Sequence, residues 1–192
     1  GMKYIIYFID VFSRFVSAKF IEDKKASTIV KAFHTCWLEL HGAPVVFHSD
    51  AGTEYINQEM SHVMSYRGIR QSHTASQSPH QNSIVERNHA VIDLMVDKIM
   101  STDPDMDPEL ALSMAVSTHN DLPGQSGHSP NMLMFLRSPV HESLADRELA
   151  GYEESDDKTS VLARMVAARH SARAAHLKCM TEDKLHRALG EK

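Results

Sequence analysis

Residues 45–52 read Val45-Val-Phe-His-Ser-Asp-Ala-Gly52, an apolar run that leads directly into a polar turn. Adjacent β-branched and aromatic residues predict a short buried strand, and the glycine that follows predicts a tight turn at its end. Asp50 is therefore expected where a strand terminates. In α/β proteins, functional side chains usually gather at strand ends. The stretch favours a domain of that class with Asp50 as a candidate functional residue.

The flanking sequence supplies the other elements that such a domain needs. Two apolar, aromatic-rich segments predict a hairpin, and a third short strand is expected later in the chain. Several segments repeat their apolar residues at helical spacing and predict amphipathic helices. The order is hairpin, helix, strand, helix, strand and further helices, which is an α/β layout. Strands are expected at 3–10, 15–21, 45–47 and 69–73, and helices at 27–41, 57–66, 84–99, 110–119, 131–136 and 159–189.

The composition excludes several classes of protein. The chain has 192 residues, of which 42% are hydrophobic, with 2 Cys and a formal net charge of −5. This is neither a collagen, nor a disordered tail, nor a disulfide-rich secreted module. Cys36 and Cys179 are too far apart in sequence to suggest a zinc site or a disulfide framework. No apolar run approaches the roughly 18–20 residues that span a bilayer, so an intracellular protein, nuclear or cytoplasmic, is expected.

The charge is unevenly distributed along the chain. Residues 1–139 carry 11 Lys/Arg and 15 Asp/Glu, residues 140–157 carry 1 and 7, and residues 158–192 carry 8 and 3. This asymmetry predicts a compact domain over 1–139, an acidic linker over 140–157 and a basic helical extension over 158–192. The net charge by itself argues against a nucleic-acid partner.

Two carboxylates suggest a metal site. Asp50 ends a strand, and Glu86 is expected in the first turn of a long helix after a polar loop at 78–83, with thirty-five residues between the two. Carboxylates brought together at a sheet edge require a cation to stay ionised, and their hard oxygens suit Mg²⁺ or Mn²⁺. Alternatively, Asp50 starts a turn and Glu86 complements the positive end of the helix dipole.

Longer motifs around these carboxylates carry a resemblance. His48-Ser-Asp-Ala-Gly-Thr-Glu-Tyr55 and Ser78-Pro-His-Gln-Asn-Ser-Ile-Val-Glu-Arg-Asn88 closely resemble the catalytic core of retroviral and LTR-retrotransposon integrases, of the gypsy-like or copia-like kind. Ordered motifs at matching spacing make a specific signal. Further similar stretches are Tyr4–Arg14, Glu39–Pro44 and His119-Asn120 followed by Gly127–Arg137.

The resemblance implies a ribonuclease-H-like mixed sheet flanked by helices and a DDE polynucleotidyl transferase. It assigns Asp50 and Glu86 as the second and third catalytic and metal-binding carboxylates, holding Mg²⁺ or Mn²⁺. The implied reaction is 3′-end processing and strand transfer of retroelement DNA. The implied partners are retroelement ends, target DNA and at least one further copy of the chain.

The first carboxylate of the family lies on its first strand, which would precede Gly1. The resemblance therefore implies that residues 1–192 enter the fold at the second strand, with that first Asp missing and the activity of this chain impaired. Asp10, with 39 residues between it and Asp50, offers an alternative metal ligand. However, an Asp at the start of a hairpin turn usually accepts bonds from nearby backbone amides. The other alternative is a non-catalytic, domesticated or fragmentary integrase-like domain that binds DNA or protein.

DNA contacts are expected from the polar loop and the helix that follows it. His80, Gln81 and Asn82 offer donors and acceptors to phosphates or base edges, and Arg87 offers a cation to phosphate. An ordinary solvated loop is the alternative. The basic helix over 158–192 binds DNA or a second copy, or else packs through Val161, Leu162, Met165, Val166, Leu177 and Leu185.

Overall fold

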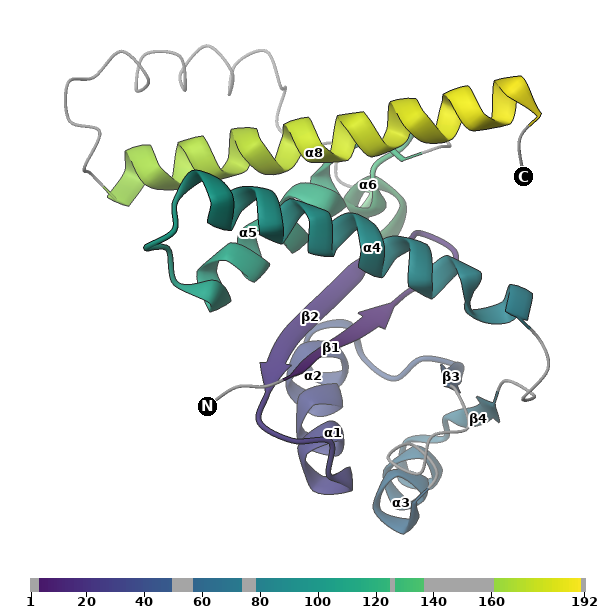
Figure 1. Ribbon diagram of the computed structural model, residues 1–192. Helices are drawn as coiled ribbons and strands as arrows, with labels where there is room; N and C mark the ends of the chain where they lie inside the picture. Colours follow the sequence, from purple (N-terminus) through teal and green to yellow (C-terminus); the bar gives the residue numbers. More distant parts are fainter. Residues whose placement is uncertain (1–3, 50–56, 74–78, 125–126, 137–160, 191–192) are drawn as a thin grey trace. The chain divides into compact units, whose positions relative to one another are not determined.

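The computed structural model describes residues 4–49, 57–73, 79–124, 127–136 and 161–190 (Figure 1). The chain divides into two compact units. Unit 1 contains residues 1–9 and 17–87, and unit 2 contains residues 10–16 and 88–192. The expected boundaries near 139 and 157 lie outside the described residues, so the three-part division stays a prediction.

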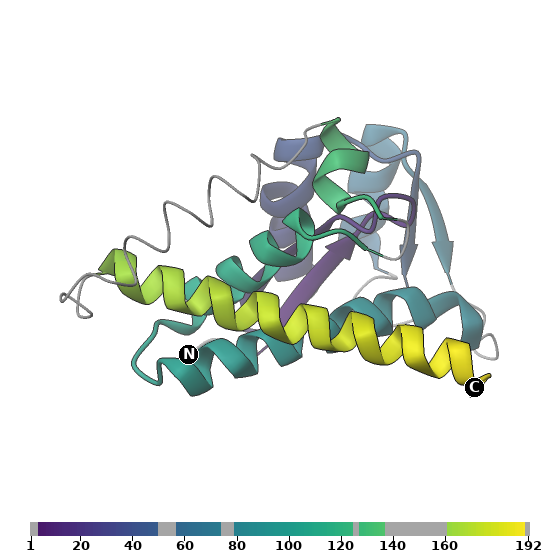
Figure 2. The same ribbon diagram turned by 90° about the horizontal axis from the view of Figure 1, so that it is seen from above.

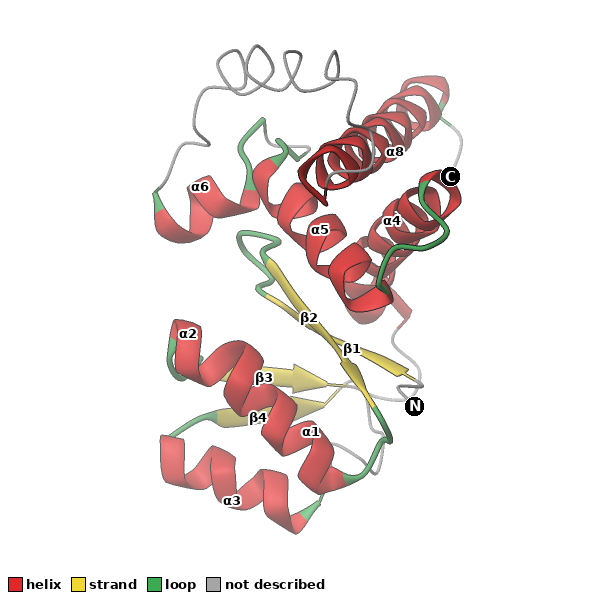
Figure 3. Cartoon of the chain, turned by 90° about the vertical axis from the view of Figure 1, so that its left-hand side faces the viewer, coloured by secondary structure: helices red, strands yellow, loops and turns green. Residues whose placement is uncertain are grey.

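The strands form two pairs. β1 (Tyr4–Ile9) and β2 (Val16–Ile21) make the expected hairpin, while β3 (Val46–Ser49) runs parallel to β4 (Arg70–His73). Figure 3 shows both pairs as yellow arrows. Ile6 and Phe8 alternate with less buried neighbours along β1, as expected for a strand with one face on the core. The predicted α/β class is confirmed.

Helices of unit 1 pack on these strands. α1 (Ala26–Phe33), the π-helical turn η1 (His34–Leu38) and α2 (Glu39–His41) form one helical run that ends at Gly42, whose φ of 78° suits glycine. α3 (Gln58–Arg67) begins at Asn57, whose side chain accepts a bond from the Met60 amide at 2.8 Å. Phe33 contacts Phe8 of β1 at 5.5 Å and Phe47 of β3 at 5.0 Å between ring centroids. One helix residue thus anchors both strand pairs.

The long helix α4 (Pro79–Thr102) begins earlier than the sequence indicates. A polar loop was expected over 78–83, but residues 79–83 are helical. The physical reason is that proline is well suited to the first helical position, where its missing N–H has no intrahelical partner anyway. The loop prediction is therefore wrong from Pro79 onward, and Glu86 lies beyond the first turn.

Unit 2 is helical. α5 (Pro108–Asp121), α6 (Pro130–Phe135) and α8 (Val161–Leu189) complete it, with Asp107 and Ser129 capping α5 and α6. Figure 2 shows α8 running alongside α4, and Thr102 at the end of α4 bonds Ser171 of α8 at 2.9 Å between hydroxyl oxygens.

α8 packs on α5 through its N-terminal part. The packing residues are small or half-polar: Val166, Ala168, Ala172, Ala175 and His176 are buried. The Arg164 guanidinium donates two bonds to Asp103, at 2.6 and 3.0 Å, and Arg169 contacts Asp121 at 3.2 Å. Leu177 and Leu185 are 51% and 55% exposed. The expectation that these two leucines pack the helix is wrong, because the buried residues of α8 lie at other positions of the helix, which leaves both leucines exposed.

Candidate active site

The ends of β3 and β4 are joined by side chains as well as by backbone. The register places His48 opposite Ser72 and Ser49 opposite His73. The His48 Nδ1 lies 3.2 Å from the Ser72 hydroxyl, and the His73 Nδ1 lies 3.2 Å from the Ser49 hydroxyl. A hydroxyl both donates and accepts, so each pair is satisfied with either imidazole tautomer. These four residues form what we call the Ser–His clamp.

The clamp adjoins the first candidate carboxylate. β3 ends at Ser49, so Asp50 is the next residue along the chain. Asp50 itself lies outside the described residues, and its proximity to Glu86 stays a prediction. What the structure does establish is that the chain enters this position from a strand in fixed register with β4.

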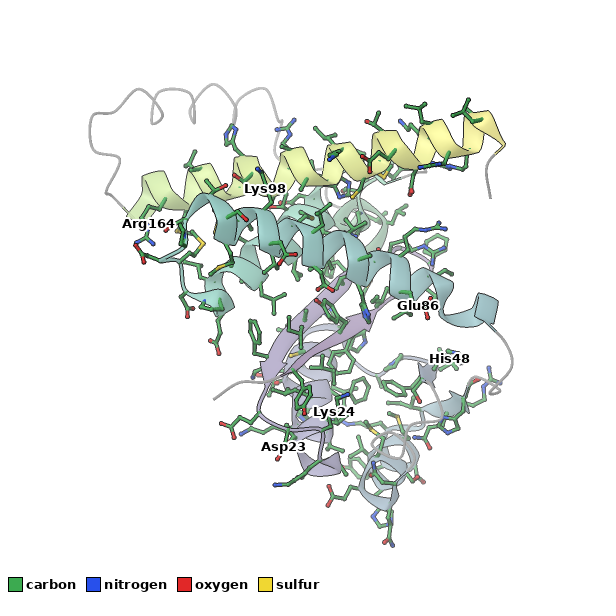
Figure 4. The ribbon with its side chains drawn as sticks, viewed as in Figure 1. Asp23, Lys24, His48, Glu86, Lys98 and Arg164 are labelled. Atoms are coloured by element: carbon green, nitrogen blue, oxygen red, sulfur yellow. The ribbon has the colours of Figure 1, made fainter. Side chains whose placement is uncertain are left out.

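Glu86 and Arg87 are exposed on α4, in the part of that helix that belongs to unit 1. Figure 4 labels Glu86 on α4 and His48 on β3. The first turn of α4 contains no acidic residue. The alternative role of Glu86 as a partner of the helix dipole is therefore wrong, because that interaction falls off within the first turn. An exposed carboxylate at this point is free to serve an external cation.

The three other candidate DNA-contact residues lie in the first turns of α4. His80, Gln81 and Asn82 are helical rather than in a loop, and their side chains lie outside the described part of the chain. Their role in contacting DNA stays a prediction. Their placement on one helix with Glu86 and Arg87 means that all five residues share a single rigid element.

Asp10 is engaged in the hairpin turn. Its Oδ2 accepts bonds from the Ser13 amide and the Ser13 hydroxyl, both at 2.7 Å. Its backbone also pairs with Phe15 and Arg14, at 2.9 Å each. The turn role predicted for Asp10 is confirmed, and its carboxylate oxygen is used by backbone and hydroxyl donors.

The donor chemistry of Asp50 and Glu86 fits a hard divalent cation. Carboxylate oxygens are the ligands that Mg²⁺ takes in proteins, usually one or two of them with water or phosphate completing the shell. Within the described ranges, which exclude Asp50, no three His, Cys, Asp or Glu side chains are grouped to hold a metal ion.

The sequence analysis did not single out Ser72 and His73, whose side chains bond those of His48 and Ser49. The signal was present in the sequence as a reversed dipeptide, His48-Ser49 on one strand and Ser72-His73 on the other. Reading it requires the parallel register, which the sequence alone does not supply.

None of the helices that the structure describes combines the length and the apolar character that a membrane span needs.

Comparisons with known proteins show what this chain is similar to. Residues 1–79 match the family model of the integrase core domain. The Pol polyprotein of Radiation murine leukemia virus is 24% identical over 155 residues, which is 81% of this chain and 27% of that protein. This chain therefore spans about a quarter of the length of that relative.

Solved structures show the same fold. A chain in the simian T-cell lymphotropic virus intasome, in complex with the PP2A regulatory subunit B56 gamma, is similar with a TM-score of 0.64 and 24% identity, covering 71% of this chain and 49% of that one. The structure of the HTLV-2 integrase catalytic core domain in complex with magnesium, in its trimeric form, is similar with a TM-score of 0.58 and 20% identity. The match covers 68% of this chain and 92% of that one. Residues 1–79 are therefore similar to the integrase core domain, and the fold of the chain is similar to that of retroviral integrase catalytic cores.

Proposed function

We propose that this chain acts in DNA integration, as a catalytic core for divalent-metal-dependent 3′-end processing and strand transfer of retroelement DNA. The observation that carries the proposal is the position of Glu86, exposed in the body of α4 where no helix dipole accounts for it. Asp50, at the end of a strand held in register, supplies the second carboxylate. The integrase core domain match of residues 1–79 supports the reaction class.

In this proposal, residues of the chain bind the cation and orient the DNA. Asp50 and Glu86 hold Mg²⁺ or Mn²⁺, which when bound activates a water or a DNA 3′-hydroxyl and stabilises the leaving oxygen. Asp50 follows β3 in the sequence and Glu86 lies on α4, so in this proposal the two carboxylates come from different parts of unit 1. Arg87, next to Glu86, pairs with a DNA phosphate and keeps the strand against the site.

The resemblance implies a third carboxylate, which the proposal does not assign to a residue of this chain. Within residues 1–192 the proposal assigns two carboxylates, so we expect these residues alone to transfer strands weakly.

The proposed partners follow from the reaction. Two DNA ends must be joined to a target, which calls for at least a dimer. The proposal assigns the DNA contacts to His80, Gln81 and Asn82, at the start of α4. The proposal places the protein in the nucleus or the cytoplasm. It also divides the chain into a core at 1–139, an acidic linker at 140–157 and a basic helix at 158–192.

A strand-transfer assay tests the proposal. A labelled duplex that ends in a recessed 3′-hydroxyl is incubated with the chain, a target plasmid and Mn²⁺ or Mg²⁺. We expect weak, metal-dependent joining that Asp50→Asn and Glu86→Gln abolish and Asp10→Asn retains. Joining that persists in Asp50→Asn, or disappears in Asp10→Asn, contradicts the assignment. Metal-independent DNA binding with no joining favours the non-catalytic alternative.

A further inference from the structure

We propose that the C-terminal half of α8, drawn in yellow in Figure 2, binds the same segment of a second copy of the chain, with the two helices running in the same direction. The surface is a row of four side chains that we call the leucine row: Leu177, Thr181, Leu185 and Leu189. The inference goes beyond the proposed chemistry, because the surface forms without metal or DNA.

The leucine row lies on the side of α8 opposite to its packed side. Ala168, Ala172 and His176 are buried in unit 2, where α8 packs on α5. Each of these three residues is followed nine positions later by a member of the leucine row. Nine residues make two and a half turns of an α-helix, so the two side chains of each such pair point to opposite sides. The face that packs on α5 therefore does not include the leucine row.

The leucine row is exposed and apolar along its length. Leu177, Leu185 and Leu189 are 51%, 55% and 64% exposed. The Thr181 hydroxyl donates to the Leu177 carbonyl at 2.8 Å, so its hydrogen is used within the helix. Single exposed leucines are ordinary on a protein surface. An apolar row at a constant spacing of four, on a helix whose other side is already packed, is typical of a face that packs on another helix.

The charges beside the leucine row indicate a second copy as the occupant. Glu182 follows Thr181 and Lys184 precedes Leu185, so the two charges lie on opposite flanks of the row. Among the described residues Lys184 makes no ion pair, while Glu182 has one exposed contact, with Lys178 at 3.9 Å, of the kind that contributes little.

A twofold axis parallel to the two helices brings opposite flanks together. Each Glu182 then lies beside Lys184 of the second copy, and the same ion pair forms twice. An antiparallel pair centred on the leucine row would instead bring Lys184 against Lys184 of the second copy. The charges therefore favour the parallel arrangement.

The expected contact is small. The leucine row covers roughly 18 Å of helix, at 1.5 Å per residue. Rows at a spacing of four interlock on helices that cross, which confines the contact to a few turns. Interfaces that bury less than about 1,200 Å² belong to weak or transient complexes. We therefore expect a dimer that forms in a concentration-dependent way.

Sedimentation velocity of the full chain, without metal or DNA and from low micromolar to submillimolar concentration, tests the inference. We expect a monomer–dimer equilibrium that Leu177→Gln and Leu185→Gln each weaken at least tenfold, because each dimer loses two buried leucines. Leu40→Gln, at a 66% exposed leucine of α2 in unit 1, is the matched control and should dimerise like the wild type. Melting temperatures at the lowest concentration should be unchanged in all three variants, because all three leucines are exposed.

Charge reversal tests the parallel pairing. Glu182→Lys and Lys184→Glu each place like charges across the interface and should weaken dimerisation. An equimolar mixture of the two variants restores both ion pairs and should form heterodimers about as tightly as the wild type dimerises.

Two results overturn the inference: a wild type that stays monomeric throughout the range, or dimerisation that Leu177→Gln and Leu185→Gln leave unchanged. A mixture that dimerises no more tightly than either charge variant alone overturns the parallel arrangement. These failures leave the proposed function to its own test, because metal dependence and strand transfer are measured separately.

Discussion

The imidazole rings of His119 and His176 meet edge to face inside unit 2, with their centroids 5.9 Å apart. His119 is on α5 and His176 on α8, and each residue is 5% exposed. The His119 Nε2 lies 3.0 Å from the Asn88 side-chain oxygen. Burial lowers the pKa of both rings, that of His119 to about 4, with the neighbouring His176 as a further cause. The packing of α8 on α5 therefore requires two neutral histidines.

This pair predicts acid sensitivity of unit 2. The unfolded His119 takes up a proton near pH 6.5 and the folded one near pH 4, so the stability that neutral His119 provides is present above pH 6.5 and lost as the pH falls through this window. For each such proton, the unfolding free energy falls by about 1.4 kcal/mol per pH unit within this window. Urea unfolding at pH 7.5, 6.0 and 5.0 measures this loss.

Two matched variants test whether His119 causes the acid sensitivity. His119→Gln should flatten the dependence of the unfolding free energy on pH. His170→Gln, at an exposed histidine of α8, the helix that carries His176, is the matched control and should keep the wild-type dependence. The salt bridge of Arg164 lowers the pKa of Asp103, so that carboxyl protonates only below its usual range and not in this window. An equal slope in wild type and His119→Gln would contradict the role of the pair.

Asn120 is predicted to be a stability hot spot. Its side chain accepts from the Val16 amide at 2.9 Å and donates to the Val16 carbonyl at 2.7 Å, both buried. Asn120→Ala leaves two buried backbone groups of Val16 without these bonds, so we expect a loss of about 2–4 kcal/mol of unfolding free energy. Asn131→Ala removes one partly buried bond to Asp121 and should cost about 1 kcal/mol. Similar losses in the two variants would refute the ranking.

The turn at Asp10 predicts a change in stability without a change in metal binding. Asp10→Ala removes the acceptor of both Ser13 bonds and should lower the unfolding free energy by about 1–2 kcal/mol. Asp10→Asn keeps a side-chain oxygen and should lose less. Mn²⁺ affinity, measured by calorimetry on the same samples, should stay at the wild-type value in both variants. A tenfold weaker affinity in Asp10→Asn would place Asp10 at the metal instead.

The sequence predicted an element well where the contacts that form the element join residues close together in the chain. Asp10 is an example, because the turn it holds closes within four residues. The hairpin, the strands near 46 and 70 and the long C-terminal helix were also predicted from short-range patterns, but the parallel pairing of those two strands was not. The start of α4 was not, because the polar composition of 78–83 favours a loop while Pro79 suits a first helical position.

Features that depend on contacts between residues far apart in the chain were not predicted from the sequence. The apolar pattern of α8 does not reveal which of its apolar residues are covered, and Leu177 and Leu185 are exposed while Val166 and Ala172 are buried. The Ser–His clamp depends on the register between two strands that are more than twenty residues apart. Asp50 and Glu86 were identified because the resemblance supplied their roles, while chemistry alone left a turn and a dipole role open for them.

The measurement that tests the central claim most directly is calorimetric titration of the full chain with MgCl₂, comparing wild type with Asp50→Asn and Glu86→Gln. Glu59→Gln, at an exposed carboxylate on α3 of the same unit, is the matched control. We predict saturable binding in wild type and in Glu59→Gln, weakened at least tenfold in each of the other two variants. No binding by the wild type, or binding of equal strength in all four proteins, would contradict a metal site formed by Asp50 and Glu86.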